Sequence, residues 1–268
     1  MNYSEICEAT IEVVKLAAGF VRERHENRRG LNIETKGRQN FVTEIDKAAE
    51  EILVKGLSRV LPEAGFVTEE GTSRKRGERF NWVVDPIDGT TNFIHGVFPF
   101  AISVGLAEGE DVVLGVVYEF GLDECFYAWK GGGAWCNGKA IKCSRAPGVN
   151  DALIATGFPY TNFSRLEEFK ESMDYFMANS HGLRRLGSAA TDIAYVACGR
   201  YDAFYEYGLH AWDIAAGMIL MREAGGEISD FKGQRSALYS DTILCAGPAC
   251  YDEFQKIVEK IMMPDEAA

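Results

Sequence analysis

The sequence predicts a mixed α/β protein, of the α+β kind, in which layers of helices and sheets pack on one another. Three observations predict it. Closely spaced strand candidates fill residues 65–129, helix and strand candidates alternate in the second half, and 47% of the 268 residues are hydrophobic, enough for a sizeable core. We expect two halves, residues 1–145 and 146–268, that meet near the middle of the chain and form one compact unit.

Two helices are expected before the strands. Apolar residues recur three and four positions apart along residues 3–26 and again from about residue 46 to residue 60, with Pro62 just after the second run. The side chains expected to face inward are Ile6, Ala9, Val13, Leu16 and Phe20 in the first helix and Ala49, Ile52, Leu53 and Leu57 in the second. The polar stretch 31–40 between them is expected to be a loop or a bent hairpin.

In the first half, strands are expected at residues 65–68 and 80–84. Three further strands, at residues 100–107, 112–118 and 124–129, are expected to form a meander, because runs rich in β-branched and aromatic residues alternate there with short turns. The glycines at 131–133 and the Asn-Gly pair at 137–138 indicate turns. In the second half, strands are expected at residues 152–156, 200–206, 227–229 and 242–245, and helices at residues 165–178, 188–198, 211–223 and 248–261.

Charge and composition argue against several classes of protein. A formal net charge of −12 disfavours general binding of nucleic acids, and no apolar run is long enough to cross a membrane. The seven cysteines are odd in number and irregularly spaced, and residues 1–8 lack the basic and apolar regions of a signal peptide. A cytoplasmic protein is therefore expected. If its substrate is an anion, bound divalent cations are needed to offset the acidic field of the chain.

The stretch "DPIDGTTNF" at residues 85–93 follows a run typical of a buried strand. Its proline would end strand pairing, so that Asp88 can turn back beside Asp85 with the Ile87 carbonyl between them. Such oxygens are the ligands that Mg²⁺ prefers, and Gly89 leaves room for a close approach. The two threonines that follow suit the start of a helix, where phosphate binds well. The alternative is an ordinary strand-to-helix turn, in which the same residue types are common.

Acidic residues elsewhere in the chain are candidates for the same site. Glu69 and Glu70 end another strand candidate, in "VTEEG", and Asp213 opens a helix candidate, in "HAWDIAAG". Taken singly, the two glutamates also fit a solvated pair, and Asp213 also fits a first-turn residue that the helix dipole favours.

Two long motifs and three shorter matches relate the chain to a known family. The pattern D-P-[ILV]-D-G-T-T-N-F is met in full at residues 85–93, and W-D-x-A-A/G-G is met at residues 212–217. The glutamate pair, "GSA" at 187–189 and "YEYGLHAWD" at 205–213 follow in the expected order. From about residue 36 to residue 226 the chain resembles the inositol monophosphatase family of Mg²⁺-dependent, lithium-sensitive phosphatases. The resemblance implies a layered α-β-α-β-α sandwich, usually a homodimer.

The resemblance also implies a site for two or three Mg²⁺ ions. The implied ligands are Glu69, Asp85, the Ile87 carbonyl, Asp88 and Asp213. Asp85 would touch both of the first two ions, and Glu69, counted among the catalytic residues, would also touch a third and weaker ion. Thr90, with Asp46 as its partner, would orient the attacking water, and Glu70 would support the ligands from behind.

The implied reaction is the hydrolysis of myo-inositol monophosphate to inositol and phosphate. A water molecule that the metal ions activate would attack phosphorus in line, without a phosphoenzyme. Glu206 matches a position that binds an inositol hydroxyl, and His210 would line the site. The implied substrate-binding residues are Asp88, Gly89, Thr90, Gly187, Ser188, Ala189, Glu206 and Asp213.

Related enzymes with the same metal core act on other small phosphate esters. Those for 3'-phosphoadenosine 5'-phosphate or histidinol phosphate usually carry K-E-F or K-S-F after D-G-T, and fructose bisphosphatases often carry D-G-S-S-N. This chain carries Thr91-Asn92-Phe93, as in the inositol type. A phosphatase for histidinol phosphate, fructose 1,6-bisphosphate or 3'-phosphoadenosine 5'-phosphate remains an alternative. Another is a family member that acts in an RNA-polymerase-associated complex.

Several further residues carry weaker expectations. Arg184 and Arg185 adjoin the implied pocket, so that either could hold a second phosphate, and both also fit surface positions. The basic run 73–79 is expected to be a solvated loop. Surface or packing roles are expected for His25, His95 and His181, core packing for Tyr201, Phe204, Tyr205 and Tyr207, and burial for Cys198 and Cys245.

Overall fold

The computed structural model describes residues 1–27, 33–37, 40–160 and 162–264, with the backbone alone for residues 33–37 and 40–43. Its helices are α1 (Tyr3–Glu26), α2 (Glu44–Val60), α3 (Thr90–His95), α4 (Leu166–Asn179), α5 (Ala189–Ala197), α6 (Ala211–Glu223) and α7 (Tyr251–Met262), with a 3-10 turn at Val149–Asp151. The strands of the first half are β1 (Ile33–Gly37), β2 (Asn40–Thr43), β3 (Gly65–Thr68), β4 (Phe80–Asp88), β5 (Ala101–Glu108), β6 (Asp111–Glu119), β7 (Glu124–Trp129), β8 (Ala134–Cys136) and β9 (Lys139–Ile141). The second half adds β10 (Leu153–Thr156), β11 (Gly182–Arg184), β12 (Ala203–Tyr207), β13 (Glu227–Ser229) and β14 (Thr242–Ala246).

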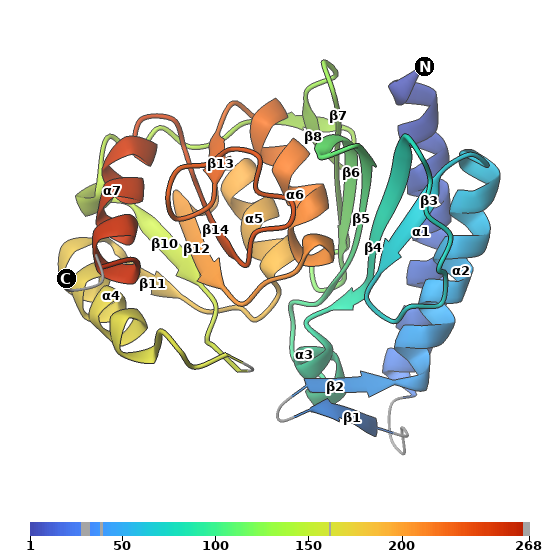
Figure 1. The fold of residues 1–268 in the computed structure, drawn as a ribbon, viewed down its shortest axis with the longest axis horizontal. Coiled ribbons are helices and arrows are strands. Elements are labelled where there is room, and N and C mark those ends of the chain that lie inside the picture. Colours follow the sequence, from blue (N-terminus) through green and yellow to red (C-terminus); the bar gives the residue numbers. More distant parts are fainter. Residues whose placement is uncertain (28–32, 38–39, 161, 265–268) are drawn as a thin grey trace.

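These elements form five layers, so the expected α-β-α-β-α sandwich is confirmed (Figure 1). Helices α4 and α7 cover a five-stranded sheet of order β11-β10-β12-β14-β13. Helices α5 and α6 lie between that sheet and a seven-stranded sheet of order β3-β4-β5-β6-β7-β8-β9. Helices α1 and α2 cover the far face of the larger sheet.

The buried face of α1 differs from the expected one. Its buried side chains are Cys7, Thr10, Val14, Ala17, Ala18 and Val21. Leu16, expected inside, is 68% exposed, while Ile6, Ala9, Val13 and Phe20 are half-buried at the margin. Both stripes have helical spacing. The stripe with the small residues faces inward, because small side chains let α1 approach α2 and β6 closely. In α2, the expected Ala49, Leu53 and Leu57 are buried and Ile52 is half-buried.

A bulge in β4 decides where the motif carboxylates point. Asp85 lies opposite Ser103 of β5 and Asp88 opposite Ala101, so β4 has one residue more than its partner here. Pro86 lies in this bulge and has no N–H to lose from the ladder. In a regular strand, residues three apart point to opposite faces of the sheet. The extra residue therefore lets both aspartates face the same cavity.

Helix α6 lies between the two sheets and is buried almost all round. Two glycines of the larger sheet let it approach the backbone closely. A Cβ atom at Gly105 would lie 2.7 Å from the Cβ of Ala215, and a Cβ atom at Gly115 would lie 2.6 Å from the carbonyl oxygen of Ala216. This packing sets the position of Asp213, at the start of α6, relative to the end of β4.

The boundaries of several expected elements were wrong. β4 continues to Asp88 through the bulge rather than ending at residue 84, β12 begins at Ala203 rather than residue 200, and α7 begins at Tyr251 rather than residue 248. The expected loop or hairpin at 31–40 holds β1 and the first residue of β2, paired antiparallel, and its other residues lie outside the described ones. The short β8, β9 and β11 were not expected as elements, because three residues show too little periodicity, whereas α3 begins at Thr90, where the two threonines were expected to start a helix.

The remaining expectations for single residues are largely confirmed. The basic run 73–79 is mostly exposed, and so are His95 and His181. The ring of His25 packs against those of Phe93, Phe98 and Phe100. The four aromatic residues between 201 and 207 are buried, as is Cys245, whereas Cys198 is half-buried, which corrects the expectation for it. Among the described residues, the helices are too short or too polar to span a membrane.

Candidate active site

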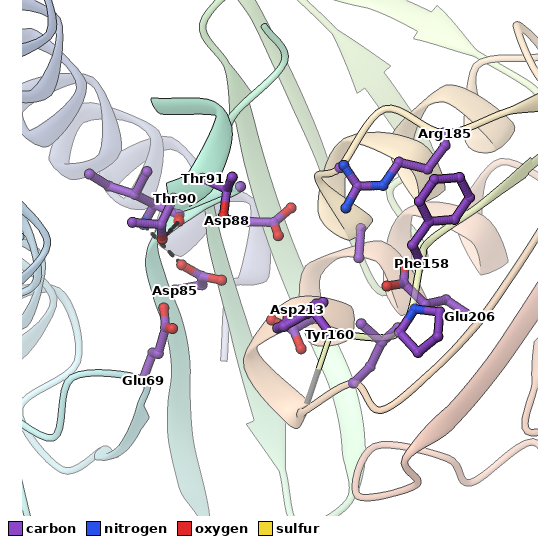
Figure 2. A pocket seen from close by; sticks show the side chains of 16 residues that line it. Glu69, Asp85, Asp88, Thr90, Thr91, Phe158, Tyr160, Arg185, Glu206 and Asp213 are labelled. Carbon is purple, nitrogen blue, oxygen red and sulfur yellow. Dashed lines mark hydrogen bonds between the residues drawn. The ribbon is translucent and has the colours of Figure 1, made fainter. Parts of the chain in front are cut away.

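A cavity of about 510 Å³ lies where the end of β4 meets the starts of α5 and α6. Figure 2 shows its side chains in two groups that face each other. Glu69, Asp85 and Thr90 lie on one side, and Phe158, Arg185 and Glu206 on the other. Asp88 and Asp213 lie between the two groups.

The two motif aspartates are held by different parts of the chain. Asp85 Oδ1 accepts a hydrogen bond from the Ile87 N–H at 2.9 Å, within the bulge of β4. Asp88 Oδ2 accepts hydrogen bonds from the Ser188 hydroxyl at 2.5 Å and from the Ala190 N–H at 2.8 Å. The start of α5 therefore fixes the orientation of the Asp88 carboxylate.

Asp213 joins them from the first turn of α6. Its Oδ2 accepts a hydrogen bond from the His210 N–H at 2.6 Å. One carboxylate oxygen each of Asp85, Asp88 and Asp213 lies within 4.8 Å of the others. Three carboxylates this close repel one another in water-poor surroundings unless a cation lies between them. Because all the donors are hard oxygens, the set fits Mg²⁺ or a similar ion better than zinc or copper.

Glu69 lies beside Asp85 at the end of β3. The loop that follows Glu69 is held by the buried carboxylate of Glu50. The Glu69 N–H continues the ladder by donating to the Val84 carbonyl at 3.2 Å. Glu50 of α2 is fully buried and accepts hydrogen bonds from the Glu70 N–H at 2.7 Å, the Thr72 N–H at 2.8 Å and the Thr72 hydroxyl at 2.7 Å. These three bonds tie the backbone next to Glu69 to α2.

We expect Glu50→Gln to weaken metal binding without removing a metal ligand. The amide has a single oxygen acceptor, and its NH₂ group would face an N–H donor of the loop, so Glu69 would be held less firmly. Losing such supporting bonds typically changes metal affinity by about 10-fold or more. The measurement is the Mg²⁺ concentration for half-maximal phosphatase activity, which should rise by about 10-fold.

The neighbouring Glu51 provides a matched control, because it lies on the exposed face of α2. Glu51→Gln should leave the Mg²⁺ dependence unchanged. An unchanged Mg²⁺ dependence in a folded Glu50→Gln protein would contradict a supporting role for Glu50.

Thr90 and Asp46 come together as the family resemblance implies. The Thr90 hydroxyl lies 3.3 Å from Asp46 Oδ1 and 3.0 Å from the Ile87 carbonyl oxygen, and it can donate to either acceptor. Asp46 is fully buried on α2, one turn before Glu50. A hydroxyl whose hydrogen points to Asp46 leaves its lone pairs free to accept a hydrogen bond from a water molecule in the cavity.

Burial raises the pKa of the carboxyl groups around the cavity. The pKa of Asp85 lies well above its ordinary value, through burial first and then through the charges of Glu69, Asp88 and Asp213. Burial raises the pKa of Asp88 to about 6, although the hydrogen bonds from Ser188 and from α5 oppose the shift. Burial and the Asp88 charge raise the pKa of Glu206 to about 8. Because a cation favours the charged forms, metal binding is expected to release protons.

Two glycines shape the wall that faces the carboxylates. Gly89 has a φ of 90° and Gly187 a φ of 91°, which other residues adopt only with strain. A Cβ atom on Gly89 would lie 3.0 Å from the carbonyl oxygen of Gly187, so the two backbones approach closely. Ala189 and Glu206 line the cavity beside them. The Ser188 side chain, by contrast, is directed to Asp88.

Some residues named from the sequence do not line the cavity. The His210 side chain is exposed, and its ring packs tilted against that of Trp212 with the ring centroids 4.8 Å apart. Only its backbone N–H reaches the site, through Asp213. Glu70 also lies outside the lining residues. Four further residues that line the cavity were not predicted from the sequence: Phe158, Pro159, Tyr160 and Leu209. The first three follow the carboxyl end of β10, which pairs in parallel with β12, and ligands commonly collect at such ends.

The layered fold and the oxygen-only donor set match the class of metal-dependent phosphatases. The sequence matches the inositol monophosphatase family over residues 2–263, and the protein belongs to this family of phosphoric monoester hydrolases. The chain is 39% identical over 231 residues to an inositol-1-monophosphatase of Mesorhizobium japonicum, covering 86% of this chain and 87% of the relative.

Other relatives carry different names. The chain is 36% identical to the Nus factor SuhB of Pseudomonas aeruginosa, over 87% of this chain and 88% of the relative. It is 38% identical to a fructose-1,6-bisphosphatase/inositol-1-monophosphatase of Thermotoga maritima, over 86% and 88%. Among solved structures, the extragenic suppressor protein suhB of Bartonella henselae superposes with a TM-score of 0.88 at 33% identity, over 94% of this chain and 98% of that one.

Proposed function

We propose that the protein is a Mg²⁺-dependent phosphomonoesterase that hydrolyses myo-inositol monophosphate to inositol and phosphate. The observation that carries the proposal is the convergence of Asp85, Asp88 and Asp213 from β4 and α6 on one cavity. The cavity, at about 510 Å³, is large enough for a small polyol phosphate. The name of the Mesorhizobium japonicum relative supports the choice of substrate.

Two Mg²⁺ ions, and a weaker third, would be held by the oxygens at the β4 end of the cavity. The proposed ligands are Glu69, Asp85, the Ile87 carbonyl, Asp88 and Asp213. When bound, the ions would acidify water and offset the charge of the phosphate. Lithium sensitivity is part of this proposal, as is a homodimer in which residues 1–145 and 146–268 of each chain act as one unit.

The protein's own groups would position the reactants. The Thr90 hydroxyl, held by Asp46, would accept a hydrogen bond from the attacking water and so direct its lone pair at phosphorus. Gly89 and Gly187, which lack side chains, would leave room for the phosphate, with the backbone near Ala189 beside it. Glu206 would bind a polyol hydroxyl. With its pKa raised to about 8 by burial, this carboxyl can both donate to and accept from a hydroxyl near neutral pH.

Two second functions follow from particular observations. The double name of the Thermotoga maritima relative, together with Arg185 in the cavity, favours sugar bisphosphates as further substrates. The name of the Pseudomonas aeruginosa relative favours a role beside RNA polymerase in the cytoplasm. A pull-down with RNA polymerase and its elongation factors tests the latter. A catalytically inactive variant that still supports growth would favour the binding role.

Phosphate release over a substrate panel tests the proposal. The panel holds myo-inositol 1-phosphate, histidinol phosphate, fructose 1,6-bisphosphate and 3'-phosphoadenosine 5'-phosphate, each with Mg²⁺ and with excess chelator. We expect myo-inositol 1-phosphate to be preferred and all release to stop with chelator, because the carboxylate cluster alone repels phosphate. Preference for another ester would keep the mechanism and correct the substrate. Release that persists in chelator would contradict the metal-dependent mechanism.

A further inference from the structure

The wall of the cavity opposite the acid cluster of Asp85, Asp88 and Asp213 carries one basic side chain among the described residues, that of Arg185. Of the described residues that line the cavity, Glu69, Asp85, Asp88, Glu206 and Asp213 are acidic, and Arg185 is the only lysine or arginine. Figure 2 shows the Arg185 guanidinium turned toward the interior of the cavity, on the side of Phe158 and Glu206. A positive charge therefore faces whatever part of a substrate extends beyond the acid cluster.

The position of the guanidinium depends on packing. Its Cζ lies over the ring of Phe158, 5.2 Å from the ring centroid. A Cβ atom on Gly187 would lie 2.5 Å from Arg185 Nη1, so this glycine leaves the space that the guanidinium occupies. Stacking on an aromatic ring restricts an arginine while leaving its N–H donors available in the plane of the group.

Among the residues that the structure describes, no group accepts a hydrogen bond from those donors. Arg185 makes no hydrogen bond or ion pair with any residue that the structure describes. The nearby buried carboxyls of Glu206 and Asp192 have their pKa raised by burial, and the charge of Arg185 lowers it only in part. The guanidinium is thus free to bind an anion, and its planar fork suits phosphate or carboxylate through paired hydrogen bonds.

We propose that Arg185 is a specificity determinant that binds a second anionic group of the substrate, at the end away from the phosphate that is hydrolysed. The inference rests on the proposed phosphatase function. If the phosphate to be cleaved lies at Asp85, Asp88 and Asp213, the rest of the molecule extends toward Glu206 and Arg185. Glu206 would then meet hydroxyls and Arg185 a second phosphate, so the site would favour sugar or polyol bisphosphates over the matching monophosphates.

The other role open to Arg185 is electrostatic balance for Glu206 and Asp192. In that role its loss would affect all substrates alike, because no part of the substrate would touch it. The two roles can therefore be separated by comparing substrates that differ in the second phosphate alone.

The test compares fructose 1,6-bisphosphate with fructose 1-phosphate on the Mg²⁺-loaded, full-length protein. The two esters share the phosphate at carbon 1 and differ in the phosphate at carbon 6. The variants are Arg185→Gln, which keeps hydrogen-bond donors without the charge, Arg185→Lys, which keeps the charge without the fork, and Arg184→Gln as control. Both arginines are exposed, but Arg184 does not line the cavity, and its Nη1 donates a hydrogen bond to the Leu183 carbonyl.

We expect wild type to prefer the bisphosphate. Arg185→Gln should lower kcat/KM for the bisphosphate by roughly 10- to 100-fold more than for the monophosphate, mainly through KM, since hydrogen bonds to a charged group are lost. Arg185→Lys should lose less, and Arg184→Gln should keep the wild-type ratio.

An equal change for both esters in Arg185→Gln would overturn the proposal in favour of electrostatic balance. So would a wild type that hydrolyses myo-inositol 1-phosphate and neither fructose ester, a result that leaves the proposed function intact. If none of the three esters is hydrolysed by folded, Mg²⁺-loaded protein, the proposed function fails and this inference fails with it.

Discussion

Asp85→Asn is expected to lower kcat by about three orders of magnitude while the protein stays folded. Phosphoryl transfer depends mainly on charge stabilisation and positioning, and Asp85 is the carboxylate that the resemblance assigns to both metal ions. Asparagine has nearly the same shape, and its oxygen can still accept the hydrogen bond from the Ile87 N–H. The substitution therefore removes charge with little change in packing.

The stability of the same variant separates loss of chemistry from loss of fold. Because burial and three neighbouring carboxylates disfavour the charged form of Asp85, the neutral asparagine should leave Tm in chelator unchanged or higher. Asp174→Asn, at an exposed position of α4, is the matched control and should keep wild-type turnover. Near-normal turnover in folded Asp85→Asn protein would disprove the metal assignment.

Chelation of metal should make the protein lose stability as pH rises, and Mg²⁺ should restore it. Glu206, with a pKa raised from its ordinary value of 4.5 to about 8, holds one more proton in the folded chain than in the unfolded chain between these values. The free energy of unfolding then falls with rising pH in this window, by about 1.4 kcal/mol per pH unit for one group, and levels off above it. The pKa of Asp88, which burial raises to about 6, adds a similar fall in the free energy of unfolding at lower pH.

The measurement is Tm from pH 5 to pH 9, in chelator and in Mg²⁺. In chelator Tm should fall, and in Mg²⁺ it should change less, because the bound cation compensates the charged carboxylates. Glu206→Gln should reduce the fall between pH 6 and pH 8. Glu171→Gln removes an equal charge from an exposed position of α4 and should leave the fall in Tm unchanged. This control separates the effect of burying Glu206 from the effect of the protein's net charge of −12. A chelated protein whose Tm rises over this range would contradict the prediction.

The sequence predicted the fold best where elements are long. The span of α1 and the exact limits of α6 and β7 agree with the periodicity, and the meander of the larger sheet follows from its alternating strands and turns. The prediction of the buried face of α1 was wrong. Two stripes of side chains on α1 have helical spacing, and only the packing of α2 and β6 against the helix selects between them. The short β11 was not predicted, because three residues carry no period.

The candidate site was predicted in part. Motif spacing pointed to Asp85, Asp88 and Asp213, which the structure brings to within 4.8 Å of one another. It gave no sign of the supporting Glu50, whose loop partners lie 20 and 22 residues away in the chain. Motif spacing also gave no sign of Phe158 and Tyr160. These aromatic residues belong to no motif, and they line the cavity only because they follow the end of β10 in the folded protein.

By itself the sequence determined which chemical groups the protein holds, in which order, and on which long elements, because local periodicity and turn chemistry depend on neighbours along the chain. The tertiary structure alone decided how those groups face one another. The extra residue in β4 turns Asp85 and Asp88 to one side, the contact of α6 with Gly105 and Gly115 sets the place of Asp213, and Gly187 with Phe158 directs Arg185 into the cavity. Each of these depends on the packing of residues that are distant in the chain, which no local pattern encodes.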